Sequence, residues 1–210
     1  MIKNSILTLA TAVVIMLLSS CSGIFDGIYD EPASSGKSEF GFVIEQTNSE
    51  AGTIYINATD YTRWTYMTFE TMAFDTLTVD QPEPAHWDIA IHRYDAKTNG
   101  GAVVETEASS FEDLVIPEDG YTSDVFTTNV IITDMSHMMD GYLSYVDSDY
   151  NEVLSRWLNV DTSSMPPIYT MSGKVYVVRL ASGKKVAIKL ENFMNGSGIK
   201  GYMTIKYKLL

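Results

Sequence analysis

From Glu39 to the C-terminus, hydrophobic and polar residues alternate in short runs, which is the pattern of strands that bury one face. Tyr61 to Phe69 is the clearest run, and Val125 to Thr133 is rich in the β-branched residues that favour strands. Short segments rich in glycine, serine and asparagine separate the last runs, as expected for turns. The sequence predicts strands over residues 53–57, 61–69, 87–93, 101–107, 125–133, 174–180, 184–190 and 199–209.

One segment, Ser148 to Leu158, carries apolar residues at helical spacing, with Asp147 or Ser148 as its expected N-cap. No internal repeat and no second domain boundary interrupts the remaining pattern. We therefore expect residues 39–210 to form a single, mainly β domain with antiparallel strands and one or a few short helices.

The N-terminus has the features of an export signal. Lys3 precedes an apolar run from Ile6 to Leu18, and small residues follow the run. The run is too short for a transmembrane helix, which needs about 20 apolar residues to cross about 30 Å of hydrocarbon. Leu18-Ser19-Ser20-Cys21 resembles the bacterial lipobox, in which the cysteine is lipidated. We expect residues 1–20 to be a lipoprotein signal peptide and residues 21–38 to be a lipidated Cys21 followed by a flexible tether.

Charge and cysteine content narrow the range of partners. The chain contains one cysteine, which the lipid would occupy, so no disulfide or thiolate metal site is expected. Its formal net charge is −13, and a chain this acidic repels nucleic acid and anionic lipid headgroups. We therefore expect no nucleic acid partner and membrane attachment through the lipid anchor only.

The sequence contains few residues in the patterns that catalytic sites require. Three histidines are present, His86, His92 and His137, and none forms a pair at zinc-binding spacing. The sequence contains neither a G-x-S-x-G nucleophile motif nor a glycine-rich phosphate loop. We therefore do not expect an enzyme, and we expect His92 to be a hydrogen-bonded structural residue.

Methionine is the unusual residue type of this chain, with eleven copies. Two segments that do not read as regular strand, residues 134–141 and 162–167, carry methionines beside Asp, Ser and Pro. Methionine usually fills cores, but a thioether is also a soft, neutral ligand for Cu(I) or haem iron. From the residues alone, loop packing and an exposed apolar contact surface remain alternatives to a metal or haem site.

The chain resembles the HmuY family of haem-binding lipoproteins from Bacteroidetes. The resemblance spans most of residues 53–208, and its most specific part is the W-D-x-A-x-H-R-Y-D stretch at 87–95. The residues that carry it are Tyr61-x-x-Trp64-x-Tyr66-x-x-Phe69, Trp87 to Asp95, Gly100-Gly101-Ala102-Val103, Pro117-x-Asp119-Gly120-Tyr121-Thr122-x-Asp124-Val125, Trp157-Leu158 and Lys174 to Arg179.

The resemblance implies a mainly antiparallel β fold that holds haem b between two loops through two axial side chains. In the founding member both side chains are histidines, but residues 158–172 of this chain contain none. Some relatives use methionine pairs instead, which makes Met165 the expected ligand of the second loop. For the first loop we prefer Met138, with Met139 and then His137 as alternatives.

The same resemblance implies a function in iron acquisition. Such a hemophore-like lipoprotein would lie on the surface of the outer membrane, or act in released form, and pass haem to a TonB-dependent outer-membrane receptor. A surface adhesin or glycan-binding module on the same scaffold is the alternative, with exposed aromatic residues such as Trp64 and Tyr142 stacking on sugars.

Overall fold

The computed structural model describes residues 43–210, which fall within one compact unit, Pro32–Leu210. The predicted signal peptide, Cys21 and the tether lie outside the described residues. Half of the described chain is β-strand and very little is helix, and the strands pair antiparallel, which confirms the predicted fold class.

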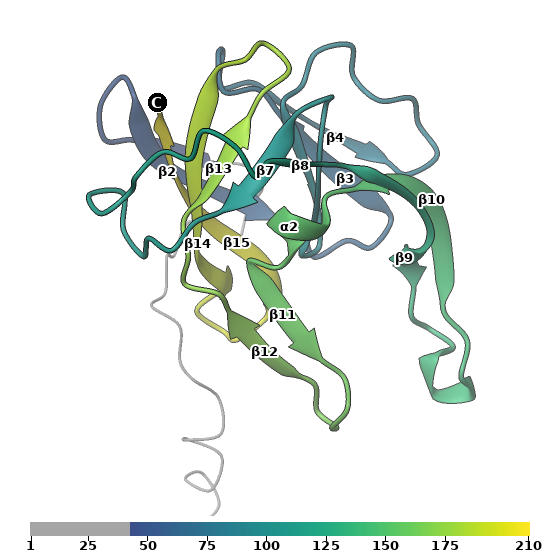
Figure 1. Ribbon diagram of the computed structural model, residues 1–210. Coiled ribbons are helices and arrows are strands. Elements are labelled where there is room, and N and C mark those ends of the chain that lie inside the picture. Colours follow the sequence, from purple (N-terminus) through teal and green to yellow (C-terminus); the bar gives the residue numbers. More distant parts are fainter. Residues whose placement is uncertain (1–42) are drawn as a thin grey trace, which may run out of the picture. The chain divides into compact units, whose positions relative to one another are not determined.

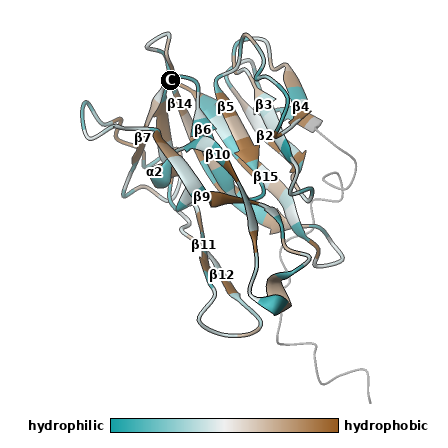
Figure 2. Cartoon of the chain, turned by 90° about the vertical axis from the view of Figure 1, so that its right-hand side faces the viewer, coloured by the Kyte–Doolittle hydropathy of each residue, from teal (hydrophilic) through white to brown (hydrophobic). Residues whose placement is uncertain are grey.

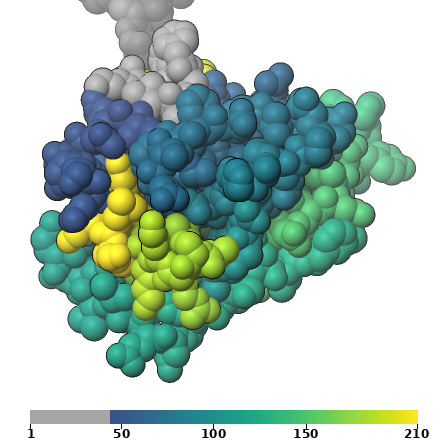
Figure 3. Space-filling model, turned by 90° about the horizontal axis from the view of Figure 1, so that it is seen from above, coloured from purple at the N-terminus to yellow at the C-terminus, as the bar shows by residue number. Residues whose placement is uncertain are grey.

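The larger sheet has seven strands and contains the longest strands that run through the core (Figure 1). In spatial order these are β1 (Val43–Gln46), β2 (Ala51–Asn57), β15 (Lys200–Leu209), β14 (Lys185–Met194), β13 (Tyr176–Arg179), β7 (Ala102–Glu105) and β8 (Thr122–Ser123). Seen from above, the C-terminal strand lies between the first strands and the segment around residue 183 (Figure 3). Turns at Gly183 and Gly198 join the last strands, where both glycines have positive φ, as the turn segments predicted.

The smaller sheet has four strands: β4 (Phe74–Thr78), β3 (Arg63–Met67), β5 (Ile89–His92) and β6 (Asp95–Thr98), in that order. All four residues of β5 are buried, because both faces of this sheet are covered. Ile89 and Ile91 face the core that the two sheets share, and Ala90 packs in a second cluster with Trp64 and Trp87. Alternate residues of a strand point to opposite faces, so one strand contributes to two cores.

Two hairpins complete the domain. The first pairs β9 (Val125–Asp134) with β10 (Ser144–Tyr150), and its tip contains the short 3-10 helix η1 (Met138–Asp140). The second pairs β11 (Leu158–Asp161) with β12 (Ile168–Met171). Ile131 of the first hairpin packs on the second cluster, so this hairpin forms a third layer over the smaller sheet.

The predicted helix over Ser148 to Leu158 is wrong in extent. Its first residues belong to β10 and its last residue begins β11, so only the single turn α2 (Glu152–Ser155) is helical. The N-cap is Asn151, whose side chain accepts a hydrogen bond from the Leu154 backbone N–H, instead of Asp147 or Ser148. Pairing with β9 holds residues 148–150 extended, which overrides the local helical spacing.

Candidate functional site

The tip of the β9–β10 hairpin is a compact turn held by polar contacts. Asp134, the last residue of β9, accepts hydrogen bonds from the Ser136 backbone N–H at 2.8 Å and from its hydroxyl at 3.0 Å. These two bonds hold the pKa of the Asp134 carboxyl below its ordinary value. Gly141 ends η1 in the left-handed conformation, with φ of +82°. The backbone of the tip is thus fixed without help from its apolar side chains.

Those apolar side chains face solvent. Met138 is 39% exposed and Met139 is 87% exposed. His137 is also exposed, and its Nδ1 lies 3.4 Å from a carboxylate oxygen of Asp140. All three candidate ligands of the first loop therefore sit on one accessible turn.

The tip of the β11–β12 hairpin, residues 162–167, has the same character. Asp161 accepts hydrogen bonds from the hydroxyl and the backbone N–H of Ser163, which hold the pKa of its carboxyl below the ordinary value. Met165 is 73% exposed. An aspartate thus stabilises the turn at each tip, and each turn exposes methionine side chains to solvent.

Both hairpins extend from the same end of the domain in two perpendicular views (Figures 1 and 2). The structure therefore places Met138, Met139 and His137 on one projection and Met165 on the other. Further large apolar side chains are exposed on the same hairpins, namely Tyr142, Tyr145 and Ile168. None of these three was predicted to contact haem, although Tyr142 was expected to be an exposed aromatic residue in the glycan-binding alternative. Which side chains ligate a metal stays a prediction.

A buried polar cluster fixes the base of the first hairpin. Asp124, which precedes β9, accepts hydrogen bonds from the Thr98 backbone N–H at 2.6 Å and from its hydroxyl at 2.9 Å. Asn151, which follows β10 and is fully buried, donates to Asp124 at 2.7 Å and to the Thr122 carbonyl at 3.1 Å. Burial raises the pKa of Asp124, although these hydrogen bonds oppose the effect. This cluster joins both ends of the hairpin to β6.

Aromatic packing fixes the base of the second hairpin. The Tyr169 ring stacks on Phe193, with centroids 5.7 Å apart, and meets the edge of Tyr94 at 5.6 Å. Trp157, which is fully buried, donates its indole N–H to the Tyr94 carbonyl at 2.7 Å. The Trp157 carbonyl in turn accepts from the Ser172 N–H at 2.9 Å, which closes the hairpin.

The specific stretch at residues 87–95 acts as internal support. His92 is fully buried, and its Nε2 lies 2.7 Å from the Tyr61 carbonyl, in agreement with the structural role predicted for it. Its Nδ1 lies 3.7 Å from Asp95, beyond hydrogen-bonding distance. Arg93 has a positive φ of 53°, and its guanidinium donates to the Thr59 carbonyl at 2.8 Å. These contacts leave His92 no access to a ligand.

A buried lysine, which the sequence did not reveal, lies beside the first hairpin. Lys97 is 3% exposed, and its ammonium lies 4.4 Å from the ring centroid of Trp64 and 5.6 Å from that of Trp87. Glu83 pairs with it at 2.5 Å and Ser148 of β10 accepts from it at 3.3 Å. Trp64 is 2% exposed, so the expectation that it stacks on a sugar is wrong.

The family model described as HmuY protein matches residues 60–207. The chain belongs to the HmuY family. None of the functionally curated proteins matches it.

Solved structures give the same relationship. A candidate HmuY-like heme-binding protein from Bacteroides vulgatus is 52% identical, with a TM-score of 0.75 over 81% of this chain and 97% of that one. A candidate lipoprotein from Bacteroides fragilis is 46% identical, with a TM-score of 0.76 over 84% of this chain and 97% of that one. The apo HmuY analog of Tannerella forsythia is 23% identical, covers 81% of this chain and 97% of its own, and shares the fold with a TM-score of 0.66.

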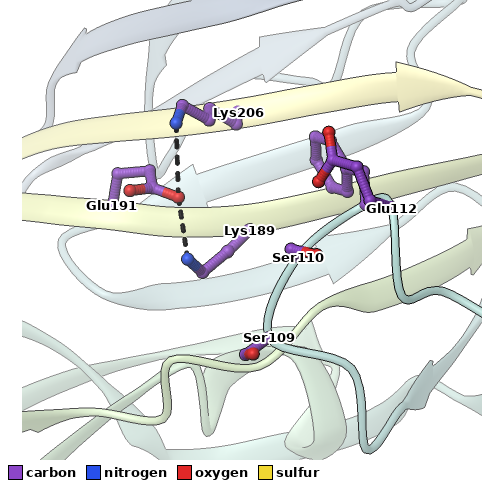
Figure 4. Close-up of a pocket in the computed structure, with 7 residues that line it drawn as sticks. Ser109, Ser110, Glu112, Lys189, Glu191 and Lys206 are labelled. Carbon is purple, nitrogen blue, oxygen red and sulfur yellow. Dashed lines mark ion pairs between the residues drawn. The ribbon is translucent and has the colours of Figure 1, made fainter.

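A hollow elsewhere on this HmuY-family domain is a poorer candidate site for a large ligand than the hairpin tips. It has a volume of about 220 Å³ and lies between the loop at Ser109 and Ser110 and the outer face of β14 and β15 (Figure 4). Ligand pockets usually have volumes of about 300–1,000 Å³. Glu191 pairs with Lys189 at 2.9 Å and with Lys206 at 3.8 Å, so both cations of the hollow already share a carboxylate partner.

Within residues 43–210, no group of three or more His, Cys, Asp or Glu side chains could hold a metal ion. No helix in the same range is long and apolar enough to cross a membrane. The hairpin tips are the strongest candidate site in the described part of the chain, because they bring exposed thioethers to one end of the domain.

Proposed function

We propose that this HmuY-family protein binds haem b between the tips of its two hairpins and carries it as cargo. The observation that carries the proposal is the placement of exposed thioethers on two separate projections at one end of the domain. A planar ligand with an axial position on each face suits two such projections. The 52% identical relative described as a candidate heme-binding protein supports the same cargo.

In this proposal Met138 and Met165 are the axial ligands of the iron, and Met139 and His137 are the alternatives on the first tip. Thioether sulfur is a soft, uncharged donor, so it stabilises ferrous iron relative to ferric iron. We therefore expect tighter binding of reduced haem than of oxidised haem.

The axial bonds should determine whether binding is weak or tight. A porphyrin that hides about 400 Å² of apolar area gains roughly 10 kcal/mol at about 25 cal/mol per Å². Association costs about 4–15 kcal/mol, which offsets most of that gain. The negatively charged propionates should stay at the solvent edge, because the protein carries the same sign of charge.

The proposal extends to location and partner. A lipidated Cys21 would hold the domain on the outer membrane at the cell surface, and a 46% identical relative is itself described as a candidate lipoprotein. From there the protein would pass haem to a TonB-dependent outer-membrane receptor. No chemical change of the porphyrin is part of this function.

A spectroscopic titration tests the proposal. Hemin, and separately haem reduced with dithionite, is added to the purified mature protein while the Soret band is recorded. We expect a shifted, saturable band with the lower Kd for reduced haem. The opposite order of affinity would contradict thioether ligation. An unchanged Soret band in both oxidation states would contradict haem binding and favour the glycan-binding alternative.

Variants then identify the ligands. Met138→Ala and Met165→Ala should each lower the affinity for reduced haem at least tenfold, and the double variant should lower it further. Met139→Ala is the matched control, because it removes an exposed methionine from the same turn. If Met139→Ala is the damaging change and Met138→Ala is neutral, the first-tip ligand is Met139.

A further inference from the structure

The methionines of this domain range from fully buried to largely exposed. At the hairpin tips, Met139 and Met165 are 87% and 73% exposed and Met138 is 39% exposed. In the core, Met67, Met194 and Met203 are at most 6% exposed; they are the buried comparison set. An oxidant in solution therefore meets the tip thioethers long before it meets those of the core.

The chemistry of this oxidation balances with one named oxidant. A peroxide transfers one oxygen atom to the thioether sulfur, its O–O bond breaks, and hydrogen peroxide leaves as water. The sulfur loses two electrons and methionine becomes methionine sulfoxide, which is polar where the thioether was apolar. The lone pair that would bind soft ferrous iron is now shared with oxygen, so the sulfoxide is a harder donor.

We propose that the two hairpin tips form a peroxide-sensitive modification site, in which oxidation of Met138 or Met165 switches haem capture off. The inference rests on the proposed haem function and adds a means of controlling it. Methionine sulfoxide reductases reverse the modification, so the switch is reversible.

The fold should survive the modification, which separates a switch from oxidative damage. The turn that carries Met138 is held by Asp134 and by backbone hydrogen bonds. The turn that carries Met165 is held by Asp161 and Ser163. None of these contacts uses a methionine sulfur, so a sulfoxide at either tip breaks none of them.

The first experiment treats the mature apo-protein with limiting hydrogen peroxide and maps sulfoxides by peptide mass spectrometry. We expect oxidation at Met139 and Met165 first, at Met138 more slowly, and at the buried comparison set last. The melting temperature should change by less than about 2 °C while the affinity for reduced haem falls at least tenfold. Treatment with methionine sulfoxide reductases should restore that affinity.

The Met203→Leu variant is the matched control, because it removes a buried thioether and keeps every candidate ligand. Peroxide should inactivate this variant as it inactivates the parent protein.

The outcomes separate the two proposals. Untreated protein that binds no haem overturns the proposed function and the switch together. Untreated protein that binds haem, and binds it equally well with sulfoxides on both tips, overturns the switch alone. Equal oxidation of the buried comparison set and the tips, or a collapse of the melting temperature, would show general damage and also overturn the switch.

Discussion

The two hairpins that carry the candidate site are built differently. β9 and β10 have ten and seven residues, lie against the smaller sheet and are closed at the base by a hydrogen-bonded cluster around Asp124 and Asn151. β11 and β12 have four residues each and are held at the base by the rings of Trp157 and Tyr169. One projection is therefore oriented by polar contacts and the other by apolar packing.

This difference has a physical consequence for a site that needs both tips. Hydrogen bonds in a buried cluster fix the relative orientation of the groups closely. Removing one partner lowers stability considerably, because the other partner is left buried without a hydrogen bond. Ring packing is less directional, and its contribution grows with the area that it removes from water. The two hairpins should therefore respond to different changes of sequence and of pH.

The largest effect should come from removing the apolar support of the second hairpin. Trp157→Ala should lower the free energy of unfolding by about 3–5 kcal/mol, because a fully buried indole is replaced by a cavity. Urea unfolding measures this change. Trp157→Phe is the matched control, since it keeps a ring while losing the hydrogen bond to Tyr94 and part of the indole volume, and it should cost less. A loss below about 1 kcal/mol for the alanine variant would contradict the role of packing.

A smaller effect should follow loss of the polar support of the first hairpin. Asn151→Ala removes the cap of α2 and leaves the partly buried carboxylate of Asp124 without one donor, at a cost of about 2–4 kcal/mol. Asn151→Asp keeps the cap acceptor but places a second carboxylate against Asp124. Urea unfolding should show that this variant recovers stability on acidification relative to the parent. Equal stability of parent and aspartate variant at pH 7 would argue against a tight polar cluster.

The third effect is a pH dependence that belongs to the first hairpin. Burial raises the folded-state pKa of Asp124 above its ordinary value of 3.8, so the folded state holds this proton more tightly than the unfolded state. Its contribution to stability is therefore present at low pH and is lost as the pH rises through the folded pKa. The loss is about 1.4 kcal/mol for each unit of difference between the two pKa values.

Asp124→Asn removes this titration. Unfolding curves for the parent and the variant at several values between pH 3 and pH 7 isolate the effect, because other carboxylates contribute equally to both proteins. The stability of the parent relative to the variant should fall with rising pH. Parallel curves would show that the two states of Asp124 differ little in proton affinity.

The smallest effect is expected at the first tip itself. The His137 side chain is exposed and its imidazole lies 3.4 Å from the Asp140 carboxylate, so His137→Ala should change stability by less than about 0.5 kcal/mol. The affinity for reduced haem should change less than twofold if Met138 is the ligand. The same Soret titration decides the point. A loss as large as that of Met138→Ala would instead indicate a His/Met ligand pair.

The strands of the core could be predicted because each buries one face and therefore alternates. β2, β3, β9 and β15 lie where the pattern placed them. β4 was missed because it is an edge strand with exposed residues at Phe74 and Asp75, so it lacks the pattern of burial. The last three residues of β10, Ser148 to Tyr150, were predicted as helix because the apolar residues that follow them have helical spacing. Their strand conformation depends on pairing with β9.

In the candidate site too, local features could be predicted and long-range contacts could not. The segments 134–141 and 162–167, which carry Met138 and Met165, could be singled out locally, since methionine beside Asp, Ser and Pro is unusual in a core segment. The supports of the two hairpins could not, because Asp124 and Asn151 are 27 residues apart and Trp157 and Tyr94 are 63 residues apart. Neither pair follows from any period of the sequence, so only the folded chain reveals them.

The enclosed ammonium group of Lys97 restricts which residues can replace lysine at this position. Its site offers one carboxylate, one hydroxyl and aromatic faces, which suit a compact cation with three donors. Arginine carries the same charge on a wider planar group with five donors, which these partners could not all satisfy. An exchange that is conservative on the surface of most proteins would here push the outer layer away from the sheet beneath it.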